Sequence, residues 1–183
     1  MAKLVSKTYG EALFELAVET DKLDTIQEEV EAVLQVLSAN DDFIKLMCHP
    51  RISVEEKSSV LETVFKGKVS DEVTGFLLTI ESKGRFQDVE EILTYFVDRV
   101  REYKKIGVAH VTSAMPLTDP EKKNVESRLL ETTSYVSFLM EYDVDPSLIG
   151  GMIIRIGDRV VDSSIKTKLE TMAKELSKIQ LKN

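Results

Sequence analysis

The chain has 183 residues, of which 43% are hydrophobic and 31% are charged, and its formal net charge is −8. This length suits one ordinary domain or two small ones, each with a modest core. An acidic chain repels phosphate groups, and its basic residues are scattered among acidic ones, so nucleic acid and anionic lipid are disfavoured as partners. The single cysteine cannot form an internal disulfide, and no apolar run approaches the roughly 20 residues that span a bilayer. We therefore expect no nucleic-acid binding and no direct membrane insertion.

Helical patterns fill the chain up to about residue 105. Apolar residues recur three and four positions apart, and helix-capping or turn residues separate the runs. The second, fourth and sixth predicted helices carry one apolar stripe each, as in an ordinary helical core. The sequence therefore predicts six helices, which begin near Ala2, Asp21 or Asp24, Asn40 or Asp41, Ser53, Ser70 and Val89.

The first and fifth helices carry more apolar surface than one core face needs. On the first, Phe14 and Val18 lie opposite an apolar stripe, and on the fifth, Phe76 and Leu78 flank the core stripe on both sides. Either all of this surface is internal core, or it forms an external groove for the amphipathic helix of a partner. Gly10 and Ala17 lie between the two apolar sides, where a neighbouring helix is expected to approach closely. The apolar stripe of the first helix consists of Val5, Tyr9, Ala12, Leu13 and Leu16.

The periodicity changes near Gly107, where we place a domain boundary. Val108 to Ala114 predicts a strand, Thr118 to Glu121 opens a helix, and strict alternation from Val136 to Val144 predicts a second strand. Two more strands follow around a turn at Gly157, and Ser163 is the expected cap of a final helix. One apolar stripe of that helix is expected to face the sheet, and it comprises Ile165, Leu169, Met172, Ala173, Leu176 and Ile179.

The predicted fold class is therefore α+β with two domains. Residues 1–106 form an N-terminal six-helix bundle, and residues 107–183 form a small α/β domain with the order β-α-β-β-β-α.

The case for an enzyme is weak. Cys48 and His49 are adjacent, but zinc needs about four ligands and His110 is the only other histidine. We interpret the pair as a buried thiol beside a helix-end imidazole. The glycines at 150, 151 and 157 lack the Lys-Ser/Thr of a phosphate loop, because Asp158 follows the last of them. The sequence predicts no catalytic residue, no cofactor and no metal site.

Four segments in order resemble one known family. The first is Tyr9 to Ala17, the second runs from Phe76 through Lys83-Gly84-Arg85 to Phe96, and the third is Val111 to Thr118. The fourth joins Asp145 to Gly151 with Gly157-Asp158 and Asp162-x-Ser164. Together they resemble the delta subunit of bacterial rotary ATP synthases, which corresponds to the mitochondrial oligomycin-sensitivity-conferring protein. Two departures are Gly10 in place of the usual alanine and Ser163 in place of glycine. The second departure predicts that this turn does not need positive φ.

The resemblance implies a non-catalytic stator subunit, present in one copy per complex at the cytoplasmic face of the bacterial plasma (inner) membrane. In that family the N-terminal bundle binds the N-terminal helix of an alpha subunit, and the C-terminal domain binds the b subunits of the peripheral stalk. The alternative is a generic helical adaptor or regulatory module that binds another amphipathic helix. The resemblance places the alpha-binding groove between the first and fifth helices, and the residues expected there are Val5, Tyr9, Ala12, Leu16, Phe76 and Thr79, Val5 by its helical position alone.

Overall fold

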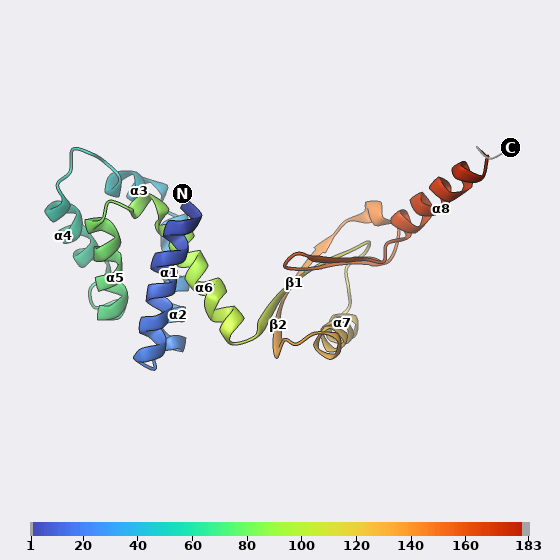
Figure 1. The fold of residues 1–183 in the computed structure, drawn as a ribbon, viewed down its shortest axis with the longest axis horizontal. Coiled ribbons are helices and arrows are strands. Elements are labelled where there is room, and N and C mark those ends of the chain that lie inside the picture. The colour runs from blue at the N-terminus through green and yellow to red at the C-terminus, as the bar shows by residue number, and fades with distance from the viewer. Residues whose placement is uncertain (1, 181–183) are drawn as a thin grey trace. The chain divides into compact units, whose positions relative to one another are not determined.

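The computed structural model describes residues 2–180, and it describes side-chain burial for residues 4–177. The chain divides into two compact units between Tyr103 and Lys104. The described part of the chain holds eight α-helices and a four-stranded mixed sheet, which makes an α+β fold (Figure 1). The change from helix to strand comes at Ile106, one residue before Gly107.

The regular elements described in the first unit are helices. Its helices are α1 (Ala2–Glu19), α2 (Leu23–Ser38), α3 (Asp41–Met47), α4 (Val54–Phe65), α5 (Asp71–Ser82) and α6 (Val89–Tyr103), with a 3₁₀ turn, η1 (Phe86–Asp88), before α6.

The start of α4 shows how local chemistry fixes these boundaries. The hydroxyl of Ser53 accepts a hydrogen bond from the backbone N–H of Glu56 at 3.2 Å, and the Glu56 carboxylate accepts one from the Ser53 N–H at 3.1 Å. This capping box satisfies two donors that the first helical turn leaves without partners. Gly67 follows the helix end with a φ of 78°, a conformation that glycine adopts at little cost.

The second unit is a sheet with the strand order β2-β1-β3-β4. The inner strand β1 pairs in parallel with β2 and antiparallel with β3, and β3 pairs antiparallel with β4. The elements are β1 (Ile106–Ser113), α7 (Asp119–Thr132), β2 (Ser137–Val144), the 3₁₀ turn η2 (Pro146–Leu148), β3 (Met152–Ile156), β4 (Arg159–Asp162) and α8 (Ile165–Gln180).

The hairpin between β3 and β4 forms at the predicted turn. Gly157 has a φ of 54°, and Ile156 pairs with Arg159 directly across the two-residue loop. Gly151 also has positive φ, and a Cβ there would lie 2.5 Å from the backbone oxygen of Ser163. Ser163 itself is not among the residues with positive φ, as predicted from its replacement of glycine.

The predicted cap of α8 is wrong by one residue. Ser164, not Ser163, accepts a hydrogen bond from the Thr167 N–H at 3.2 Å, while the Ser163 hydroxyl donates to the Met152 carbonyl. Asp162 completes the arrangement, because its carboxylate accepts from the Ser164 N–H at 2.8 Å and the Thr167 hydroxyl at 2.7 Å. These bonds hold the pKa of Asp162 below its usual value.

The prediction that the stripe of α8 faces the sheet is also wrong. Its four large described members, Ile165, Leu169, Met172 and Leu176, are exposed, from 42% for Ile165 to 65% for Leu176. Figure 1 shows α8 running away from the sheet, whereas α7 lies beside it. Ala173 is exposed as well, and the side chain of Ile179 lies outside the described residues.

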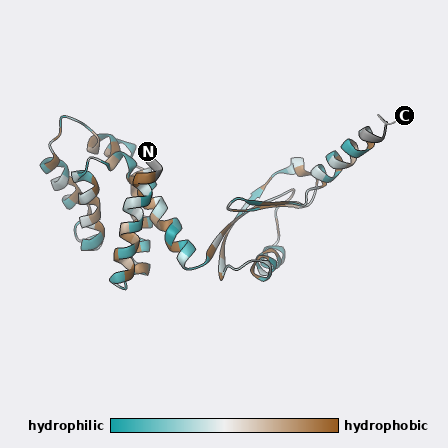
Figure 2. Ribbon diagram, in the orientation of Figure 1, coloured by the Kyte–Doolittle hydropathy of each residue, from teal (hydrophilic) through white to brown (hydrophobic). Residues whose placement is uncertain are grey.

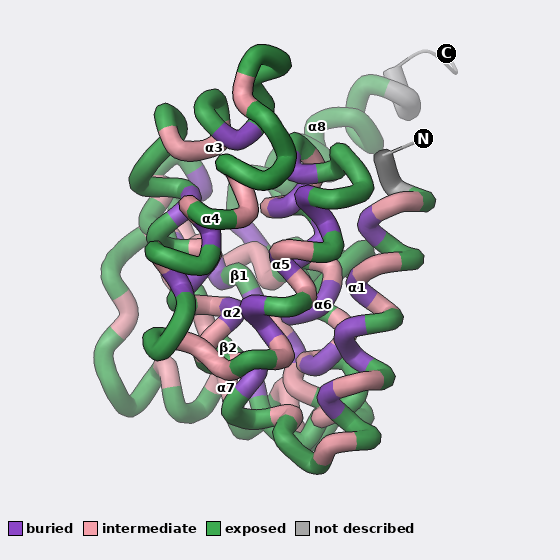
Figure 3. Tube along the Cα trace, turned by 90° about the vertical axis from the view of Figure 1, so that its left-hand side faces the viewer, coloured by how far each residue is buried: buried purple, intermediate pink, exposed green. Residues whose placement is uncertain are grey.

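Apolar residues occur in both units, but burial is concentrated in the first (Figures 2 and 3). Among the residues whose burial is described, 20 buried apolar side chains form one cluster in the helical unit. The second unit buries four, namely Ala109, Val111, Phe138 and Leu148. Helix α7 buries no residue, and a cavity of about 330 Å³ lies between it and β3. The helical unit thus has a deep core, and the sheet unit has a thin one.

Candidate partner-binding face on helices α1 and α5

One side of α1 is fixed against α6. Leu13 and Ala17 are fully buried there, and Gly10 marks the closest approach, because a Cβ at Gly10 would lie 2.5 Å from Tyr95 Cδ1 and 3.1 Å from the Ile92 carbonyl oxygen. The small residues Gly10 and Ala17 therefore allow the backbones of α1 and α6 to approach closely, as their position in the sequence predicts. Phe14 is buried too, with its ring 5.4 Å from that of Tyr103.

Polar contacts hold the same pair of helices together. Glu11 accepts hydrogen bonds from the Tyr95 hydroxyl at 3.1 Å and from Arg99 Nε at 3.2 Å. The Arg99 guanidinium also lies 5.1 Å from the centre of the Phe14 ring. The hydrogen bond that Arg99 donates to Glu11 raises the pKa of Arg99, and desolvation raises that of Tyr95. The orientation of α1 about its own axis is thereby fixed.

The other side of α1 carries the predicted binding residues. Val5, Tyr9 and Leu16 are half-buried and pack against the core cluster, while Ala12 is exposed between them. Val18, predicted to lie on the far side with Phe14, is 42% exposed. The buried side thus consists of Ser6, Gly10, Leu13, Phe14 and Ala17. The predicted binding residues Val5, Tyr9 and Leu16 lie at the edge of the core, with Ala12 exposed among them.

Helix α5 is anchored by Val73, Leu77 and Ile80, which are buried. Phe76 is half-buried and packs against the core cluster, and Thr79 is exposed one turn later. Helix α1 packs against α6, and α2 contacts both α1 and α5. The partly exposed residues of α1 and α5 define what we call the α1/α5 face: Val5, Tyr9, Ala12, Leu16, Phe76 and Thr79.

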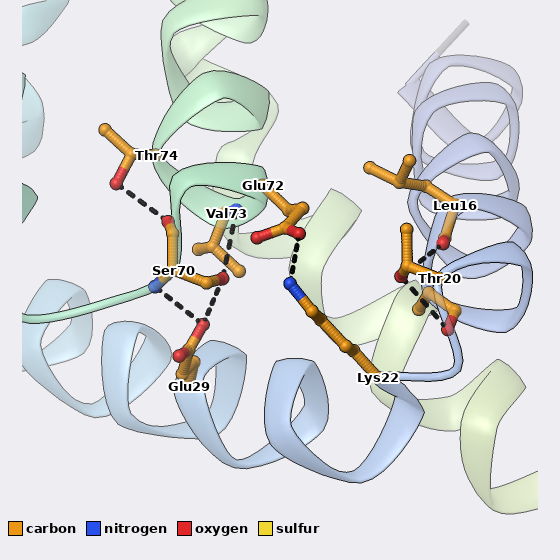
Figure 4. Close-up of polar contacts among 9 residues, drawn as sticks. Leu16, Thr20, Lys22, Glu29, Ser70, Glu72, Val73 and Thr74 are labelled. Atoms are coloured by element: carbon orange, nitrogen blue, oxygen red, sulfur yellow. Dashed lines mark hydrogen bonds and ion pairs between the residues drawn. The ribbon is translucent and has the colours of Figure 1, made fainter.

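Helix α2 joins the two helices at one end of this face (Figure 4). Lys22, just after α1, lies 2.6 Å from the Glu72 carboxylate in the first turn of α5. This bond raises the pKa of Lys22 and lowers that of Glu72. Glu29 of α2 accepts hydrogen bonds from the backbone N–H and the hydroxyl of Ser70, the N-cap of α5, at 3.0 and 2.6 Å.

These polar connections were not found from the sequence. Lys22 and Glu72 are 50 positions apart, and each has the appearance of an ordinary surface charge near a helix start. Only the packing of α2 against both α1 and α5 brings them together. The half-buried apolar side chains on α1 and α5, with the charged Lys22 and Glu72 at one end, suit an amphipathic helix.

A buried ion pair lies elsewhere in the unit, beside Cys48. Glu81 is 3% exposed and lies 3.3 Å from Lys57, next to a cavity of about 190 Å³. Cys48 lines this cavity but is exposed, so the prediction of a buried thiol is wrong. Desolvation, with a contribution from the Glu81 charge, raises the pKa of the thiol, which makes it a poor nucleophile. No helix in the described part of the chain is both long and apolar enough to cross a bilayer.

Comparison with known proteins gives a consistent result. A sequence model of the ATP synthase delta (OSCP) subunit family matches residues 5–176. The ATP synthase subunit delta of Lachnoclostridium phytofermentans is 57% identical over 181 residues, which cover 99% of this chain and 100% of that protein. The subunit delta of Brevibacillus brevis is 37% identical over 96% of this chain and 99% of its own length.

A solved structure shares the fold. A chain of the Toxoplasma gondii mitochondrial ATP synthase hexamer, determined by cryo-electron microscopy, superposes with a TM-score of 0.70. The match covers 93% of this chain and 96% of that chain at 22% identity. On the family match and the full-length relatives, the chain belongs to the ATP synthase delta (OSCP) subunit family, and it is a non-catalytic component of the peripheral stalk.

Proposed function

We propose that this chain links the catalytic head of the ATP synthase to the b subunits of the stalk, in one copy per complex. The α1/α5 face of the six-helix unit binds the N-terminal helix of an alpha subunit, and the second unit binds the stalk. The observation that carries the first part is the set of half-buried apolar side chains on α1 and α5, led by Tyr9, Leu16 and Phe76. They are anchored to the core and still present apolar surface that a helix can cover.

The second part rests on the exposed stripe of α8. Leu169, Met172 and Leu176 are 52%, 59% and 65% exposed, although they follow the spacing of a buried helix face. We propose that this stripe packs against the helices of the b subunits. The assembled complex would hold the chain at the cytoplasmic face of the bacterial plasma membrane through these partners and not through a segment of its own.

The stator role sets a demand on affinity. A joint that resists the torque of the rotor needs slow dissociation, and affinity within one kind of interface is tuned mostly through the off-rate. Nanomolar binding corresponds to about −12 kcal/mol, so a single helix on the α1/α5 face has to be well packed. The Glu11–Arg99 contact holds α1 in place, and the Glu29–Ser70 contact holds α5 in place. This preorganisation lowers the entropic cost of binding.

The test is a calorimetric titration of the full chain with a synthetic peptide of the alpha subunit's N-terminal segment from the same organism. Wild type is expected to bind one peptide, and Ala12→Asp to lose binding because it places a charge in a desolvated contact. Ala32→Asp is the matched control, since Ala32 is also an exposed helical alanine but lies on α2.

Two results would contradict this proposal. One is unchanged affinity in Ala12→Asp, which would place the peptide elsewhere. The other is equal loss in both variants, which would indicate a general effect of acidic charge. A folded wild type that binds no alpha peptide but does bind an unrelated amphipathic helix would favour the adaptor alternative.

A further inference from the structure

Gly75 lies in the interior of α5, where glycine is unusual. Among all residues only proline has a lower helix propensity, because glycine loses the most backbone freedom when a helix forms. A glycine inside a helix therefore generally has a reason in the surrounding structure. The residue is exposed, and its exposure leaves room for a side chain.

The other seven glycines of the chain each have such a reason. Four have positive φ, and at the other three a Cβ would come closer to a neighbouring side chain than Cβ contacts normally allow. Gly75 has neither property, since its φ is not positive and a Cβ there would meet nothing within 4 Å. Nothing in the described part of the chain thus requires glycine at this position. The four with positive φ are Gly67, Gly84, Gly151 and Gly157, and the three with close contacts are Gly10, Gly107 and Gly150.

Gly75 shares a side of α5 with the proposed binding residues. Positions 72, 75, 76 and 79 have the spacing i, i+3, i+4 and i+7, which places them on one helix face. Glu72 is the residue that pairs with Lys22 at the end of the α1/α5 face, and the Thr79 hydroxyl donates to the Gly75 carbonyl at 2.8 Å. Because Gly75 has no side chain, the backbone of α5 is uncovered at this position, next to the half-buried Phe76.

We infer that Gly75 is the point where the backbone of the bound alpha-subunit helix comes closest to α5. This inference rests on the proposed function of the α1/α5 face. A missing Cβ lets a second backbone approach. Exposed Ala12 is the matching small residue on α1. Phe76 supplies the apolar anchor beside the contact, so Gly75 determines how deeply the partner helix is seated.

The experiment compares Gly75→Ala with wild type in the full chain, by thermal unfolding and by titration with the alpha N-terminal peptide. Two opposite shifts are expected. The midpoint of thermal unfolding rises, because alanine favours the helix and has open space at this position. The affinity for the peptide falls by roughly five- to a hundredfold, because the added methyl group overpacks the contact. Gly75→Leu should weaken binding further.

Ser59→Ala is the matched control, since Ser59 is an exposed interior residue of α4. It should raise the unfolding midpoint slightly and leave peptide affinity unchanged. The inference is overturned if Gly75→Ala binds as tightly as wild type, or if it lowers the unfolding midpoint, which would reveal an internal role. If wild type itself binds no peptide, the proposed function fails and this inference fails with it, and the wild-type titration separates the two cases.

Discussion

Helices α6 and α8 are nearly equal in length, with 15 and 16 residues, and both carry a continuous apolar stripe. In α6 six apolar residues from Val89 to Val100 are buried, whereas in α8 the stripe from Ile165 to Leu176 is exposed. The pattern along the chain is alike, so the difference lies in what surrounds each helix. Helix α6 is covered by α1 and α2, and α8 touches little of its own unit beyond the turn η2.

The comparison teaches that periodicity identifies an apolar face without identifying what covers it. A helical unit with a deep core covers its own stripes. A sheet unit with four buried apolar side chains among the residues described leaves a comparable stripe exposed. Loss of an apolar side chain should therefore lower the free energy of unfolding strongly in α6 and change it little in α8.

The largest effect on stability is expected for Phe96→Ala in α6. Phe96 is fully buried, so its truncation leaves a cavity and should lower the free energy of unfolding by about 3–5 kcal/mol. Chemical denaturation followed by circular dichroism measures this loss. A change below about 1 kcal/mol would mean that the core of the helical unit relaxes around the gap.

The next effect concerns binding and not stability. Leu169→Asp in α8 should change the free energy of unfolding by no more than about 0.5 kcal/mol, because the side chain is exposed. Its affinity for the soluble part of the b subunits should fall by at least roughly thirtyfold, as for a central interface residue. Thr171→Asp, exposed on another side of α8, is the control. Equal affinities for the two variants would remove the stripe from the stalk interface.

A smaller effect is expected for Gly10→Ala on α1. Alanine gains about 1 kcal/mol in helix propensity, but its Cβ would lie 2.5 Å from Tyr95 Cδ1, and such overpacking typically costs about 1–3 kcal/mol. We expect a net loss of about 1 kcal/mol in the same denaturation experiment. A net gain would show that α1 and α6 separate easily, contrary to the tight coverage of α6.

The smallest effect is the acid titration of Asp162 before α8. Its pKa is lowered in the folded chain, so its contribution to stability is present above the unfolded pKa and is lost as the pH falls through the folded one, below about pH 4. The midpoint of the Asp162 carboxyl in an NMR titration should lie below the ordinary value. An ordinary midpoint would mean that the contacts to Ser164 and Thr167 do not persist in solution.

Much of the fold could be predicted because its signals are local. The capping box at Ser53 and the two-residue turn at Gly157 depend on neighbours within a few positions, and both appear as expected. The close approach at Gly10 was also predictable, since a small residue between two apolar faces has few other uses.

The wrong predictions concern features that depend on contacts between residues far apart in the sequence. Cys48 was expected to be buried by analogy with other free thiols, but it lies at the rim of a small cavity. Ser163 and Ser164 are equivalent as caps by residue type, and the carbonyl of Met152 on β3 determines which hydroxyl is free. The Lys22–Glu72 and Glu29–Ser70 contacts at the candidate site likewise join residues more than 40 positions apart.

The strand order has a mechanical consequence for a subunit of the stalk. β1 follows the helical unit and is an inner strand, hydrogen-bonded to β2 along its whole length and to β3 along much of it. Tension that enters the sheet unit at Ile106 therefore acts along both ladders at once. Shear of this kind must break many hydrogen bonds together, whereas a peripheral strand would unzip one bond at a time. Under the proposed linkage, a pull on the sheet unit would therefore load both ladders of β1 together.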